Sequence, residues 1–89
     1  MKIKDGYLLR EIAGTYIVVP VAERVIDFKG MIILNEVSAK IWEFMQTDRE
    51  YSEIIDCILS DFDVDKDTAE KDLDEFLKQM NENGIIEND

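Results

Sequence analysis

Alternating aspartates in the second half of the chain are the residues whose types and spacing most suggest chemistry. Asp61, Asp63 and Asp65 have the spacing that opens an EF-hand calcium loop. In that motif the sixth position is a glycine and the twelfth is a glutamate, whereas this chain has Lys66 and Asp72 there. We therefore predict no metal site here. We expect a solvated acidic connection between two helices, with Asp65 or Asp67 acting as a helix cap.

The chain lacks the residue pairs that most catalytic centres need. It contains no histidine, so neither a Ser-His nor a Cys-His pair is available. Its one cysteine, Cys57, lies on the apolar side of a helical pattern and is expected to pack in the interior. Asp72, Asp74 and Glu75 offer paired carboxylates, but a helix face provides no cleft that would shift their pKa values. No glycine-rich phosphate loop occurs. We predict no enzymatic activity and no cofactor.

Charge and composition narrow the class of protein further. The 89 residues fit one domain, residues 1–89, and carry a formal net charge of −11. Residues 43–89 hold sixteen acidic and four basic side chains, which should repel both nucleic acids and anionic membranes. The N-terminal residues lack the apolar core of a secretory signal, and no apolar run is long enough to cross a bilayer. A single cysteine suits a reducing compartment, so we expect a cytoplasmic protein.

The elements that would position any site begin with strands. Residues 7–12 and 15–20 are rich in β-branched and aromatic side chains, and Ala13-Gly14 lies between them. This pattern predicts a β-hairpin in which Gly14 takes a positive φ. Pro20 has no N–H to give to a sheet, so it should close the second strand.

A loop and a third strand follow the hairpin. Residues 21–30 read as a connection that ends at Gly30, with a short extended piece at Val25-Ile26. Residues 31–34 form an apolar run that predicts the third strand. Asn35 comes next, and its side-chain oxygen can accept from the first free N–H groups of a helix.

Three amphipathic helices make up the rest of the chain. Apolar side chains recur with the helical period over about 36–46 and 52–61, and again from an Asp67–Glu70 capping box to Asn83-Gly84. Ile85-Ile86 should fold back onto the core or pair briefly at a sheet edge. Strands first and helices after predict an α+β fold with helices on one face of the sheet.

Two stretches of the sequence resemble the PqqD family, the precursor-peptide recognition elements of ribosomal peptide-modifying pathways. The first is residues 31–43, MIILNEVSAKIWE, and the second is residues 70–80, EKDLDEFLKQM, followed by Gly84-Ile85-Ile86. The other predicted strand and helix fall at matching positions, so the resemblance covers nearly the whole chain. It implies a three-stranded antiparallel sheet followed by three helices, related to winged helix-turn-helix domains.

The resemblance also implies how the domain works. A leader peptide would bind as an added strand along the third strand, beside the last helix, and the domain would present it to a modifying enzyme such as a radical SAM protein. An edge strand with unpaired backbone groups makes this physically sensible. We expect Leu34 to belong to the core and Ile32 to line the groove. The complete set of residues expected to bind peptide is Met31, Ile32, Ile33, Leu34, Lys71, Asp72, Glu75, Phe76 and Gln79.

Two other functions remain open at the level of sequence. The winged-helix kinship suggests a nucleic-acid binder, although residues 67–79 contain five acids against two lysines and no basic stripe. The same sheet edge could instead pair with a second copy of the chain, which would make the protein a small homodimerisation module.

Overall fold

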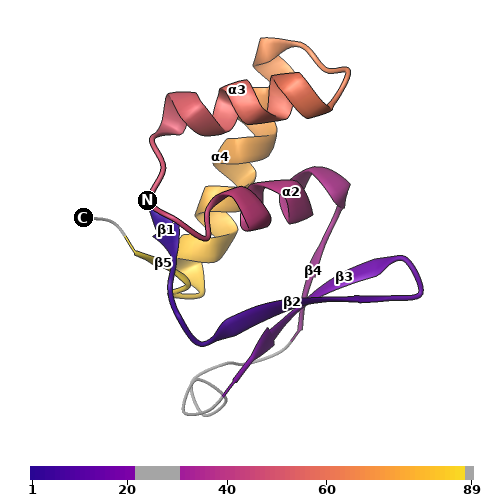
Figure 1. Ribbon diagram of the computed structural model, residues 1–89, viewed down its shortest axis with the longest axis vertical. Helices are drawn as coiled ribbons and strands as arrows, with labels where there is room; N and C mark the ends of the chain where they lie inside the picture. The colour runs from indigo at the N-terminus through magenta and orange to yellow at the C-terminus, as the bar shows by residue number, and fades with distance from the viewer. Residues whose placement is uncertain (22–30, 88–89) are drawn as a thin grey trace.

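The computed structural model describes residues 1–21 and 31–87, and it places a sheet beneath three helices (Figure 1). The predicted extended piece at Val25-Ile26 lies outside the described residues. The elements, in chain order, are β1 (Lys2–Ile3), β2 (Tyr7–Ile12), β3 (Thr15–Pro20), β4 (Ile32–Leu34), α2 (Glu36–Phe44), α3 (Tyr51–Asp61), α4 (Lys66–Glu82) and β5 (Ile86–Glu87). This is the α+β fold that the sequence predicts, with one addition, the pairing of β1 with β5.

The hairpin of β2 and β3 forms with the predicted bounds. The strands are antiparallel and in register from the Tyr7–Pro20 pair to the Ile12–Thr15 pair. Ala13 and Gly14 make the turn with φ values of 52° and 81°. Positive φ at both central residues is the mark of a type I′ turn, whose twist matches that of the flanking strands. The predicted positive φ of Gly14 is therefore confirmed, and Ala13 shares it.

Strand β4 adds antiparallel to β3, so the strand order of this sheet is β2-β3-β4. Ile32 and Leu34 face the helices and are each 4% exposed, while Ile33 between them is 57% exposed. The alternation follows from the two-residue period of a strand. It assigns one face of β4 to the core and the other to solvent.

Each helix begins at a polar cap. Oδ1 of Asn35 accepts from Ser38 N at 2.8 Å at the start of α2, as predicted. The cap of α4 lies two residues before the predicted Asp67–Glu70 box, because Asp65 rather than Asp67 accepts from Thr68 N, also at 2.8 Å. That bond lowers the pKa of the Asp65 carboxyl, since the backbone donor stabilises its charged form.

The C-terminal turn returns the chain to its beginning. Gly84 takes a φ of 68° after α4, and Ile85 N then donates to Met80 O at 2.9 Å. The next residues form β5, which pairs antiparallel with β1 through Ile86 and Ile3. The predicted return of the tail to the core is confirmed. Its partner strand was not predicted, because two residues carry no detectable period.

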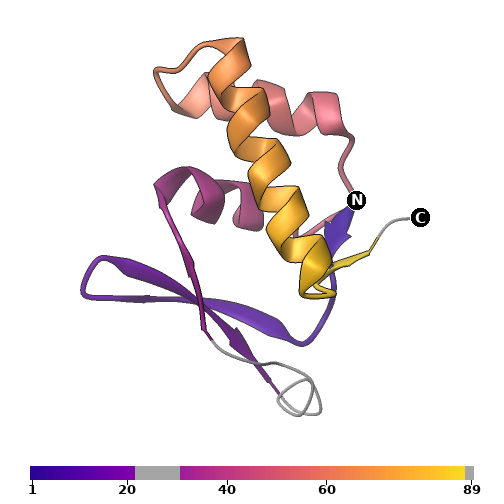
Figure 2. The same cartoon turned by 180° about the vertical axis from the view of Figure 1, so that it is seen from behind.

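The helices cover one side of the three-stranded sheet, and α4 runs in front of α2, from near the end of α3 down to the small β1–β5 sheet (Figure 2). Trp42 lies in this core, as its position on an apolar stripe predicts. The side chains that are under 2% exposed, and so form the centre of the core, include Ile41, Met45, Ile54, Ile58, Leu73, Met80 and Ile85. No helix among the described residues is long and apolar enough to cross a membrane.

Candidate functional site

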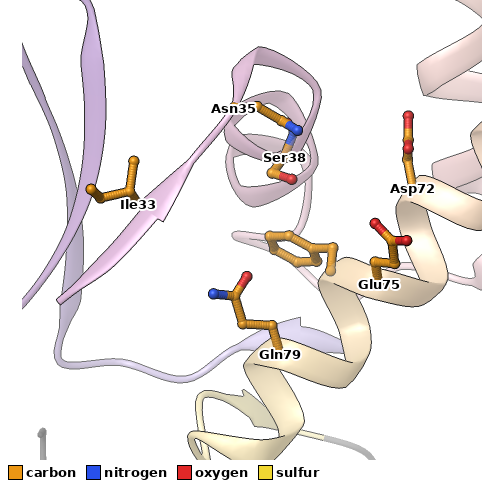
Figure 3. Close-up of a pocket in the computed structure, with 7 residues that line it drawn as sticks. Ile33, Asn35, Ser38, Asp72, Glu75 and Gln79 are labelled. Atoms are coloured by element: carbon orange, nitrogen blue, oxygen red, sulfur yellow. The ribbon is translucent and has the colours of Figure 1, made fainter. Parts of the chain in front are cut away.

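A cavity of about 150 Å³ lies where β4 and the start of α2 face the middle of α4. Figure 3 shows Asn35 and Ser38 on one side of it, with Asp72, Glu75 and Gln79 along the facing helix. The lining residues are Ile33, Asn35, Ser38, Asp72, Glu75, Phe76 and Gln79. The site therefore joins a strand, a helix N-terminus and a helix that lies about forty residues further along the chain.

The strand that borders this cavity has an open edge. Within residues 1–21 and 31–87, β4 is paired on one side only, because it is the last strand in the order β2-β3-β4. A strand at the end of a sheet leaves every second residue with its N–H and C=O directed away from the sheet. Those groups can accept another strand.

The hairpin determines which residue of β4 offers these groups. A two-residue turn makes Ile12–Thr15 the closing hydrogen-bonded pair, so alternate residues from Thr15 direct their backbone groups toward β2. The bond from Val21 N to Gly6 O, 2.8 Å long, continues that phase. The other residues of β3, which alternate with these, must then direct their backbone N–H and C=O groups toward β4. Because Ile33 lies opposite Ile17, its N–H and C=O point out of the sheet toward the open edge.

The lining of the cavity is mostly polar, and two of its residues are acids. Phe76 is 2% exposed and belongs to the core, so only a part of its ring reaches the cavity. Asp72 and Glu75 are one helical turn apart on α4, and both contribute carboxylates. None of the seven lining residues is cationic, and no ion pair within the described part of the chain includes either acid. A cation brought here would meet two carboxylates without a competing partner.

Comparison with known proteins assigns the chain to a family. The family model for coenzyme PQQ synthesis protein D, PqqD, matches residues 17–86. The chain belongs to the PqqD family. Among solved structures, one described as "TbiB1 in Complex with the TbiA(beta) Leader Peptide" is similar at 25% identity and a TM-score of 0.74. The match covers 100% of this chain and 98% of that one. No curated protein matches the sequence.

The structure brings five of the nine predicted site residues of this PqqD-family chain to the cavity. They are Ile33, Asp72, Glu75, Phe76 and Gln79. Met31 is exposed just before β4, and Lys71 is exposed on α4; neither lines the cavity. Leu34 is in the core, as expected.

Ile32 was expected to line the groove, but it is 4% exposed and lies in the core beside Leu34, on the same face of β4. Ile33 lines the cavity instead. Two other lining residues, Asn35 and Ser38, were missed as site residues. Asn35 was recognised only as a cap, although a cap that directly follows an edge strand must lie at the end of that edge.

Exposed aliphatic side chains gather on the outward face of the same sheet. Leu8, Ile12, Met31 and Ile33 are all exposed, and none of them lies on the side that packs against the helices. Ile33 belongs to both this face and the cavity. A strand added at β4 would extend the apolar face by one row.

Cys57 and Lys40, which lie outside the cavity, have pKa shifts with local causes. Burial raises the pKa of the Cys57 thiol, which keeps it in its unreactive form. Asp61 forms an ion pair of 3.1 Å with Lys40 and raises the pKa of that amine through the same hydrogen bond. The described residues include no group of three potential ligands that could hold a metal ion.

Proposed function

We propose that this domain binds the leader segment of a precursor peptide as a fourth strand along β4 and presents it to a peptide-modifying enzyme, without catalysing a reaction itself. The observation that carries the proposal is the open edge at Ile33, which runs beside a cavity formed by α4. Backbone hydrogen bonds to an edge give affinity to an extended peptide, and pockets for alternate side chains give specificity. In this domain the open edge of β4 would provide the affinity, and the cavity beside it would provide the specificity.

The comparisons support the proposal from an independent direction. The similar solved structure contains TbiB1 with a leader peptide, and it matches this chain over its full length. The interface on a domain of this size is small, so we expect dissociation constants of about 0.1–10 μM. The peptide-binding set under test is the predicted one, with Asn35 and Ser38 added and Ile32 and Leu34 serving as core support.

Replacement of Ile33 by proline tests strand addition. Because the N–H of Ile33 points away from β3, Ile33→Pro should remove a donor from the open edge and leave the β3–β4 pairing in place. Ile33→Ala is the matched control, since it removes the side chain but keeps the N–H. We would select a phage-displayed library of random twelve-residue peptides on the wild-type domain and then measure binding of the enriched peptides to each variant.

We expect the enriched peptides to bind Ile33→Ala within a few-fold of wild type and to bind Ile33→Pro at least about tenfold more weakly, the effect of losing roughly one backbone hydrogen bond at a constrained edge. Circular dichroism would verify that both variants fold. If the proline variant is folded and binds as tightly as wild type, or if wild type enriches no peptides, strand addition at β4 is wrong.

Self-association is the second candidate, and the same edge favours it. Two copies could pair their β4 strands, with Met31 and Ile33 exposed beside the contact. The net charge of −11 on each copy opposes this pairing. Sedimentation over a range of concentrations, with and without an enriched peptide, separates the two functions, because a peptide on β4 would dissociate a dimer held by that edge.

A further inference from the structure

The cavity beside β4 has the size of a pocket for one side chain. Its volume is about 150 Å³, whereas pockets that enclose a whole small molecule usually measure about 300–1,000 Å³. One end is set by Asn35 and Ser38 at the start of α2, and the other by Gln79 on α4 (Figure 3). A peptide chain cannot enter such a space, but one long side chain can.

An added strand would direct one of its side chains into this space. Side chains of a strand alternate between the two faces of a sheet. Those of a peptide on β4 that share the face of Ile32 and Leu34 would turn toward α4, and those that share the face of Ile33 would extend the outer apolar surface. Two peptide positions, opposite Ile32 and Leu34, would face inward, and a cavity of about 150 Å³ has room for the side chain of one of them.

The lining of the cavity defines the chemistry of that inward side chain. Ile33 and Phe76 give the lining apolar atoms on which an aliphatic stem can lie, while Asp72 and Glu75 suit a positive group. Lysine and arginine combine these two parts, since they lay their methylene groups on apolar surface and extend the charge beyond it. An acidic side chain would be repelled here, and the excess of acids in residues 43–89 adds to that repulsion.

We propose that the groove selects a lysine or arginine at the single peptide position that faces the cavity, with aliphatic residues at the neighbouring, outward positions. The inference rests on the proposed function, because it assumes that a peptide pairs with β4. It adds the identity of the side chain that the site reads. Asp72 and Glu75 bind its charge, and Phe76 contacts its stem.

The random peptide library described above tests this selection when it is applied to variants of the two acids. We would compare wild type with the Asp72→Asn, Glu75→Gln double variant, which keeps the shape of both side chains and removes their charge. Glu82→Gln is the matched control, because it removes one charge from the same helix at a position outside the cavity. Wild type and the control should enrich lysine or arginine at one position, and the double variant should not.

A synthetic pair then measures the effect. The most enriched peptide would be compared with the same peptide carrying norleucine in place of its lysine or arginine, by titration calorimetry. We expect the cationic peptide to bind wild type about three- to tenfold more tightly, as for a partly exposed charge pair, and the double variant less than about twofold more tightly. The preference for the cation should fall as salt concentration rises.

The two proposals fail in different ways. If wild type enriches peptides that Ile33→Pro does not bind, but these show no basic preference, the charge selection is wrong and strand addition stands. If the preference for lysine persists in the double variant, Asp72 and Glu75 do not read the charge, and the inference is overturned. If no peptide is enriched at all, the proposed function fails and takes the selection with it.

Discussion

At the scale of single residues, Tyr51 and Asp74 connect α3 to α4 at the surface. The Tyr51 hydroxyl donates to Asp74 Oδ1 at 2.8 Å. This bond, with some burial, raises the pKa of Tyr51 to about 12 from its ordinary value of 10.0. The neutral phenol is the donor, so losing its proton both breaks the bond and places a phenolate beside a carboxylate.

A titration at high pH checks this pair. Because the pKa of Tyr51 is higher in the folded state, its contribution to stability is complete below about pH 10 and is lost as the pH rises toward about 12. Phenolate absorbance should show a late transition that Tyr51→Phe removes and that Asp74→Asn shifts to lower pH. If Asp74→Asn leaves that transition unchanged, the hydrogen bond does not form in solution.

The candidate site could be predicted from the sequence only in part, and β4 shows why. Strand alternation correctly separates Ile32 and Leu34 from Ile33. It does not say which face the helices will cover, because that depends on the hand of the sheet and on the path of α4. The site residues on α4 were easier to predict, because Asp72, Glu75 and Gln79 lie three or four residues apart and therefore share one face of the helix.

At the scale of elements, the hairpin was the most predictable part of the chain because its turn has its own chemistry. Two strand-forming segments separated by two residues leave little choice of register, and a glycine at the second position fits the type I′ turn. The start of α4 was less certain. Asp65 with Thr68 and Asp67 with Glu70 both have cap spacing, and only the observed path of the chain selects the first pair.

The turn of the hairpin contains one residue, Ala13, whose type fits the backbone conformation poorly. Ala13 has a φ of 52°, a conformation that carries a steric cost for residues with a Cβ. Ala13→Asn should stabilise the domain by about 0.5–1 kcal/mol, because asparagine tolerates this region and Asn-Gly is a preferred type I′ pair. Thermal unfolding should shift upward by about 2–8 °C for a chain of this size.

The contrasting variant is Ala13→Val, which puts a β-branched side chain at the same positive φ and should lower the unfolding temperature. Ala13 is exposed, so neither change disturbs the core. If both substitutions destabilise the protein by a similar amount, the turn does not have the type I′ geometry in solution.

At the scale of the whole molecule, apolar and acidic surfaces are separated. The exposed aliphatic residues of the sheet face outward on one side, and most acids of residues 43–87 lie at the surface of the helical half. The open edge of β4 lies at the boundary between these two surfaces. A peptide bound there would present one side to the apolar face and the other to the carboxylates. A single peptide strand can do this, because its side chains alternate between the two sides.

The molecule also depends on a tie between its two ends. Ile3 N donates to Met45 O at 2.9 Å, Lys4 N donates to Ile85 O at 2.8 Å, and β1 pairs with β5. The side chain of Ile3 is 3% exposed and lies in the same cluster as Met80. Two short strands, β1 and β5, thus fix the first and last described segments beside the end of α4 (Figure 1).

Truncation of Ile3 should reveal how much of the total stability this tie carries. Ile3→Ala leaves a buried cavity and should cost about 2–4 kcal/mol, a large fraction of the roughly 4–13 kcal/mol expected for a domain of this size. Ile12→Ala removes the same atoms from a side chain that is 60% exposed, so it should cost less than about 1 kcal/mol. Urea unfolding of both variants gives the comparison. Equal losses would mean that the β1–β5 sheet is not formed in solution, and the helices would then have to hold the core without it.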